Sequence, residues 1–252
     1  MLYFDFRGKW RFMDLTIFKI SREQFNRIPE VEQIFILQLS TFLNDINVLQ
    51  KLALFSTNKK PNVGEFENKA QNAQAFFVFT ILAGKLCEGW KMIRNDFLSK
   101  GLRQEYSDLL PEDSRDALSY LEKYFCEQNI LRKIRNKFAF HYDSKVIKKE
   151  LEANKDENFE LILSEFAGNS LFYFANTIVG SAILSAAEQD TQEAMNAMLG
   201  EIIETSKKFQ LFLNDAMVVA MEKYDIDKNY TTFTLSDVPK LNDIQVPFFV
   251  SK

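Results

Sequence analysis

Histidine is almost absent from this chain of 252 residues, in which His141 is the sole example. Because the unperturbed imidazole titrates between about pH 5 and 8, any histidine-dependent chemistry must use His141. One histidine and two scattered cysteines, Cys87 and Cys126, do not supply the usual ligands of a zinc site. We therefore expect no metal. We interpret the two cysteines as reduced, packed thiols of a cytoplasmic protein.

Proline and glycine are also scarce, at five and eight residues, which favours long helices. The longest uncharged stretch, 166–187, contains eight Gly, Asn, Ser or Thr residues and lies between Glu165 and Glu188 without basic anchors. The first ten residues lack the basic-then-apolar order of a signal peptide. These features predict no membrane segment.

Several motifs of nucleotide-dependent and metal-dependent enzymes are missing. The chain has no G-x-x-x-x-G-K-[ST], G-x-G-x-x-G or H-E-x-x-H, and we expect no cofactor. It also lacks the G-x-S-x-G elbow of serine hydrolases, although a Ser–His–Asp or Cys–His site built on His141 stays open. The net charge of −4 excludes a uniformly basic nucleic-acid coat but not a local basic patch.

Apolar residues recur at helical spacing through most of the chain. In segment 30–55, for example, the expected apolar face is formed by residues that step by three or four positions: Val31, Phe35, Leu39, Phe42, Ile46 and Leu49. The predicted helices are 30–55, 68–100, one that starts at Pro111, one within 130–143, and 191–224. The fold class that this pattern predicts is mainly α: an antiparallel helical bundle with a possible small β-hairpin.

The predicted domain organisation is a helical domain, 30–224, between an N-terminal extension, 1–29, and an extended C-terminal tail, 225–252. For the N-terminal extension, the sequence does not decide between short strands and a first helix. Aromatic and β-branched runs around Gly168 predict the hairpin, with one more helix as the alternative. A near-heptad seam in 191–224 is interpreted as bundle core, with a dimer seam as the alternative.

The segment that contains His141 is strongly basic. Between Leu131 and Lys149 the chain has seven basic residues and one acidic residue, Asp143, so the local net charge is +6. On one helix, Arg135 and His141 lie about 120° apart and about 9 Å apart along the axis. A long arginine can still reach a group held beside the histidine, and a partner subunit could complete such a pocket.

This combination of residue types suits the cleavage of RNA. Clustered cations attract phosphate. An imidazole can move a proton to or from the 2′-OH or the 5′-leaving oxygen, and a guanidinium can stabilise the charge on the phosphoryl oxygens. The competing interpretation is structural: His141 is then a packed core residue, and the basic run is a solvated helix face.

The sequence from Ile134 to Asp143, I-R-N-K-F-A-F-H-Y-D, resembles the signature of the HEPN superfamily, in which Arg and His are separated by four to six residues. Here the gap is five, and the polar residue that commonly follows the Arg is Asn136. The order of the helices, and the aromatic run around Gly168 and 171–174, are similar to abortive-infection-type members. The resemblance covers about 30–224.

The resemblance implies a metal-independent endoribonuclease whose active site forms between two motif helices of a homodimer. Arg135 and His141 would be catalytic and Asn136 supportive. It also implies a role in phage defence or a toxin–antitoxin system, with RNA as substrate and an antitoxin protein as a further partner. The residues expected to bind RNA are Arg132, Lys133, Lys137, Tyr142, Lys145, Lys148 and Lys149.

Two other functions stay open. A HEPN-like scaffold could bind RNA or a protein partner through its basic helix without cutting, and a purely structural helical protein would keep His141 in its core. A second copy of the pattern, I-R-N-D-F at 93–97, could place Arg94 or Asp96 in the same cleft, although we interpret this repeat as coincidence.

Overall fold

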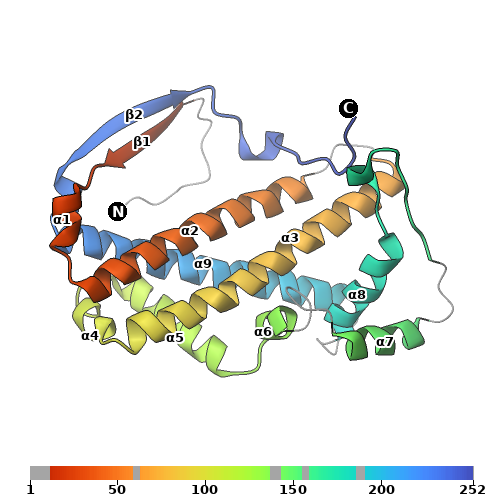
Figure 1. The fold of residues 1–252 in the computed structure, drawn as a ribbon, viewed down its shortest axis with the longest axis horizontal. Helices are drawn as coiled ribbons and strands as arrows, with labels where there is room; N and C mark the ends of the chain where they lie inside the picture. The colour runs from red at the N-terminus through yellow and green to blue at the C-terminus, as the bar shows by residue number, and fades with distance from the viewer. Residues whose placement is uncertain (1–11, 59–62, 137–142, 155–158, 186–190, 252) are drawn as a thin grey trace.

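The computed structural model describes residues 12–58, 63–136, 143–154, 159–185 and 191–251. Three long helices form its centre: α2 (Glu30–Thr57), α3 (Glu65–Met92) and α9 (Thr191–Lys223). They lie side by side in Figure 1, where α2 and α3 run in opposite directions. A fourth helix, α5 (Glu112–Cys126), packs against α9. The predicted antiparallel helical bundle is confirmed.

Shorter helices surround this centre. They are α1 (Arg22–Asn26), α4 (Leu102–Tyr106), α6 (Ile130–Ile134), α7 (Ser144–Ala153) and α8 (Tyr173–Ser185). α6 packs against α3 and α9, whereas α7 packs against α8 at one end of the bundle (Figure 1). Within the described ranges, no helix is both long enough and apolar enough to span a bilayer.

The predicted helix 68–100 consists of two kinds of helix. α3 ends at Met92, and the chain continues as a π-helical turn, Ile93–Leu98. This wider turn keeps Ile93 and Phe97 buried in the core. Gly101 then adopts a left-handed conformation, with φ of 83°, which is typical of a residue that ends a helix and which glycine adopts without steric cost.

Aromatic rings join the helices in the core. Phe97 contacts Phe35 of α2, Tyr106 of α4 and Phe212 of α9, with ring centroids 5.1, 5.7 and 5.2 Å away. The seam of α9 is buried within this single chain, as at Ile202, Phe209 and Leu213. The interpretation of the seam as bundle core is therefore confirmed, and its apolar face is used inside the chain.

One prediction about α2 is wrong at its first turn. Val31, expected on the apolar face, is 41% exposed, whereas Glu32 is buried. Glu32 accepts hydrogen bonds from the hydroxyls of Tyr106 (2.8 Å) and Tyr224 (2.5 Å) and from Lys223 Nζ (3.0 Å). Because three donors satisfy the carboxylate, it can lie in the interior, where an unpaired charge would be strongly unfavourable.

The small antiparallel β element is present, but most of it lies away from Gly168. Strands β1 (Phe12–Phe18) and β2 (Tyr230–Ser236) form a two-stranded sheet from the two ends of the chain. Around Gly168 the structure has one isolated bridge, Ile162 to Leu171, closed by a short 3-10 turn. Leu163 and Phe166 are exposed there, so no packed face supports a longer ladder.

The C-terminal tail, described as far as residue 251, contains β2 and makes hydrogen bonds to the helical bundle. Besides β2, its last part is held against α2 and α3 by hydrogen bonds to main-chain carbonyls. Asn58 Nδ2 donates to Ile244 O (2.8 Å), and Gln74 Nε2 donates to Val246 O (2.8 Å). The extension contributes both of the elements that the sequence left open, because the strand β1 is followed by the helix α1.

Candidate active site

The motif arginine follows a short helix that is capped at its first end and buried against the bundle. Asn129 caps α6: its Oδ1 accepts from the backbone N of Arg132 (2.9 Å), and its Nδ2 donates to Tyr124 O (3.0 Å). Ile130, Leu131 and Ile134 are buried against the bundle. This anchored helix therefore determines where Arg135, the residue that directly follows it, lies.

Arg135 is held by two side chains. Its Nε donates to Glu88 Oε1 of α3 (2.8 Å), and its Nη1 donates to Oδ1 of Asn136 (2.9 Å). The Arg135 side chain is 28% exposed, so one part is packed and one part can be reached from solvent. The structure thus brings together two of the predicted catalytic residues, Arg135 and Asn136, and adds Glu88.

Glu88 is shared between two cations. Its carboxylate also accepts from Lys91 Nζ, at 3.0 and 3.3 Å. Partial burial acts to raise the pKa of Glu88, but the hydrogen bonds from Lys91 and Arg135 outweigh it, and the net pKa lies below the ordinary carboxyl value. At neutral pH Glu88 is therefore ionised, and it orients the guanidinium by a charge-assisted hydrogen bond.

The residue before Glu88 is a buried thiol. Burial raises the pKa of Cys87 to about 12, although Arg132 and Arg135 act in the opposite direction. A thiol with this pKa is protonated at neutral pH and is a poor nucleophile. Both cysteines are free; the expectation that both are packed holds for Cys87, but Cys126 is exposed.

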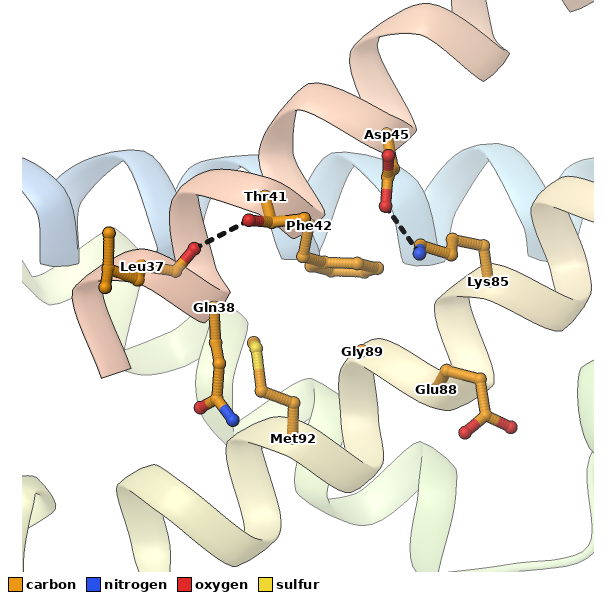
Figure 2. A pocket seen from close by; sticks show the side chains of 9 residues that line it. All are labelled: Leu37, Gln38, Thr41, Phe42, Asp45, Lys85, Glu88, Gly89 and Met92. Atoms are coloured by element: carbon orange, nitrogen blue, oxygen red, sulfur yellow. Dashed lines mark hydrogen bonds and ion pairs between the residues drawn. The ribbon is translucent and has the colours of Figure 1, made fainter. Parts of the chain in front are cut away.

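Glu88 also lines a groove between α2 and α3, which Figure 2 shows from close by. The groove has a volume of about 370 Å³. Asp45 and Lys85 form an ion pair across it (2.5 Å). At its floor the ring of Phe42 lies against Gly89, where an added Cβ would be only 2.0 Å from Phe42 Cζ. Glu88 therefore connects the motif arginine to an open surface groove.

Arg132 and Lys133, expected to bind RNA, lie on α6. The guanidinium of Arg132 donates to the carbonyl of Phe125, one of the last carbonyls of α5, which have no partner within their own helix. Lys133 is half-buried. Arg132 thus serves the junction between α5 and α6, and α6 exposes less positive charge than the sequence suggests.

Lys145, Lys148 and Lys149 are exposed on α7. Their spacing of three and four residues places them on one side of the helix. Asp143 is not part of the motif helix: it caps α7, and its carboxylate accepts from the backbone N of Lys145 (3.0 Å). Lys137, His141 and Tyr142 lie outside the described residues.

The second I-R-N-x-F pattern does not join this cluster among the described contacts. Arg94 and Asn95 are exposed and contact each other, and Asp96 pairs with Lys100 (2.5 Å). In the same described part of the chain, no group of three or more His, Cys, Asp or Glu residues is placed to hold a metal ion.

Sequence reasoning missed Glu88 and the groove. The pair Glu88 and Lys91, spaced three apart on a predicted helix, is ordinary for a helix surface. Only the packing of α6 on α3 turns this pair toward Arg135.

Searches against protein-family models, curated proteins and solved structures found no match to this chain.

Proposed function

We propose that this protein is a metal-independent endoribonuclease of the HEPN type, with Arg135 and His141 as catalytic residues. The observation that carries the proposal is the setting of Arg135, which follows an anchored helix, is oriented by Glu88 and Asn136, and remains partly exposed. Only five residues separate it from the single histidine of the chain. An oriented, accessible guanidinium is what phosphate recognition requires.

In the proposed reaction the 2′-oxygen attacks the adjacent phosphorus, and the bond to the 5′-oxygen breaks. The His141 imidazole moves the proton from the 2′-OH or to the leaving 5′-oxygen. Arg135 stabilises the charge on the non-bridging oxygens. The products are a 2′,3′-cyclic phosphate and a 5′-hydroxyl, so the reaction consumes no water at this step.

Glu88 has a positioning role in this scheme. An arginine has five N–H donors, and the contacts to Glu88 and Asn136 use one on Nε and one on Nη1. The remaining donors suit a bound phosphate. The exposed lysines Lys145, Lys148 and Lys149 would guide the RNA backbone toward this site.

The alternative is a HEPN-like module that binds RNA or a protein partner without cutting. The pairing of Arg135 with Glu88 favours this alternative in one respect, because the carboxylate already offsets part of the positive charge of Arg135 within the chain. Either function is consistent with a role in phage defence or with inhibition by an antitoxin protein, which would cover the basic surface.

The decisive experiment is RNA cleavage by purified protein in EDTA. We expect wild type to cut and to leave cyclic phosphate ends, and we expect His141→Ala and Arg135→Ala to be inactive at matched folding and oligomeric state. Arg94→Ala is the matched control, because Arg94 is an exposed arginine outside the site. Equal cleavage by wild type and His141→Ala would refute the mechanism.

Binding without cleavage would support the alternative. In that case RNA binding should weaken when Lys145, Lys148 and Lys149 are replaced together by Ala, with a lower salt dependence than wild type. His141→Ala would then bind RNA as wild type does.

A further inference from the structure

An extended part of the C-terminal tail crosses the end of α2 and the first half of α3 (Figure 1). We define this strap as residues 244–250, which follow the short 3-10 turn Leu241–Asp243. None of the seven strap residues is buried: Pro247 and Val250 are exposed, and the other five are half-buried. The strap therefore lies on the bundle without adding a side chain to its core.

Three side-chain amides of the bundle hold the strap by its main-chain carbonyls. Asn58, which directly follows α2, donates from Nδ2 to Ile244 O (2.8 Å). Gln71 and Gln74 of α3 both donate from Nε2 to Val246 O, at 3.2 and 2.8 Å. Residues three apart lie on the same side of a helix. The surface of α3 thus presents a pair of N–H donors to one carbonyl of an extended chain.

A fourth amide holds the other end of the strap. Asn169, the last residue of the 3-10 turn Ala167–Asn169, donates from Nδ2 to Val250 O (2.7 Å) and accepts at Oδ1 from Val250 N (3.0 Å). This two-way pairing reproduces what a neighbouring β-strand offers to a chain. We call the four residues that bind the strap the amide cluster: Asn58, Gln71, Gln74 and Asn169.

The contacts of the amide cluster define the chemistry of the chain that it binds. They go to main-chain atoms, so they depend on an extended conformation rather than on particular side chains. The carbonyl that accepts from both glutamines precedes Pro247. A residue before proline favours an extended or polyproline conformation, in which the carbonyls make no internal hydrogen bonds. The cluster therefore fits an extended peptide that contains proline.

The strap is attached in a way that permits exchange. Each hydrogen bond to an amide replaces one to water, so its net contribution to stability is small. Segments with few buried apolar contacts open locally at low cost in free energy, and no strap residue is buried. The strap is nevertheless tethered to the chain, which keeps its effective concentration at about 1 mM. A competing peptide must overcome this concentration.

From the placement of these amides around the strap, we propose that the amide cluster is a peptide-binding site for an extended, proline-containing segment of a partner protein. The strap is its resident occupant, and the partner segment displaces it. The proposal goes beyond the nuclease and does not depend on it, because its evidence is the set of contacts between the strap and the bundle.

Cutting the folded chain before the strap tests the site. The recognition sequence of a specific protease is inserted between Pro239 and Lys240, which are both exposed. After cleavage, a fluorescein-labelled peptide of residues 241–252 is added at low protein concentration, where the cut strap dissociates. Fluorescence anisotropy should show saturable binding with a dissociation constant of about 100 μM or less. The uncut protein should bind about 10-fold more weakly or worse, because its tethered strap competes at about 1 mM.

Substitutions in the cut protein test the contacts. Replacing both Gln71 and Gln74 by Ala should weaken peptide binding about 10-fold or more, because Val246 O loses its two donors. Gln104→Ala is the control, since Gln104 is an exposed glutamine of α4. Circular dichroism must show every variant folded. A Pro247→Ala peptide should bind several-fold more weakly than the natural peptide.

Three results would overturn the proposal. The first is a cut strap that neither dissociates on dilution nor exchanges with the labelled peptide, since it would then be a permanent part of the fold. The second is the absence of binding to cut protein at peptide concentrations up to 1 mM. The third is binding that the double glutamine substitution leaves unchanged. Equal affinity of the Pro247→Ala peptide would overturn the assignment of proline-containing partners.

Discussion

Gly89→Ala should destabilise the protein, although the same change usually stabilises a helix. Alanine is favoured over glycine in a helix interior by about 1 kcal/mol. At position 89, however, the new Cβ would lie 2.0 Å from Cζ and 2.5 Å from both Cε atoms of Phe42. Ordinary carbon–carbon contacts are about 3.5 to 4.0 Å. The ring must therefore move by about 1.5 Å or more relative to α3.

The ring of Phe42 has little room for such a movement. It is buried and packs edge-on against Phe209 of α9, with centroids 5.3 Å apart. Overpacking of a core typically costs about 1 to 3 kcal/mol. Because a 2.0 Å approach is a severe clash, we expect a cost in the upper part of this range, about 2 to 3 kcal/mol. After the gain of about 1 kcal/mol from helix propensity, the net loss in the free energy of unfolding should be about 1 to 2 kcal/mol.

Urea denaturation followed by circular dichroism measures this loss. Gly200→Ala is the matched control, because Gly200 lies in α9 and an added Cβ there meets nothing within 4 Å. We expect Gly200→Ala to stabilise the protein by about 0.5 to 1 kcal/mol. Phe42→Leu should reduce the penalty of Gly89→Ala in a double-mutant cycle. A Gly89→Ala protein at least as stable as wild type would refute the close approach of α2 and α3.

Two further predictions concern the buried and half-buried carboxylates. Tyr106→Phe should lower the free energy of unfolding by about 1 to 3 kcal/mol, because Glu32 loses one of its three donors in the interior; the same denaturation assay checks it, and an unchanged midpoint would contradict the network. Glu88→Gln should alter the pH dependence of stability. The folded pKa of Glu88 is lowered, so its ion pairs stabilise wild type above the ordinary carboxyl value of 4.5, and this contribution is lost as the pH falls through the lower folded pKa. Thermal melts from pH 7 to pH 3 should therefore show a gap between wild type and Glu88→Gln that closes on acidification, and a constant gap would contradict the assignment. Because both side chains of the pair are partly exposed, the gap at neutral pH should be below about 1 kcal/mol.

The proposed nuclease depends on a residue pair that the chain presents within seven positions, from Arg135 to His141. The sequence shows the spacing, the residue types and the basic charge around them. It does not show the contact between Arg135 and Glu88, because these two residues are 47 positions apart and lie on different elements. A mutant of Glu88 would therefore be a sensitive probe of how Arg135 is oriented.

The periodicity of apolar residues by itself determined where the long helices lie. Backbone hydrogen bonds within a helix join residues four apart, so helical structure is encoded locally, and α2, α5 and α9 begin and end close to the predicted residues. The turn at Gly101 and the start of a helix after Pro111 follow from local backbone preferences for the same reason.

The tertiary structure alone decided the contacts between helices. Burial of Glu32 rather than Val31 follows from Tyr106, Tyr224 and Lys223, which approach it from α4 and from the end of α9. Likewise, β1 pairs with β2 because two segments that are more than 200 residues apart in the sequence meet beside the bundle (Figure 1). Such contacts depend on which helix faces pack together, and that choice is made by the whole core rather than by any single segment.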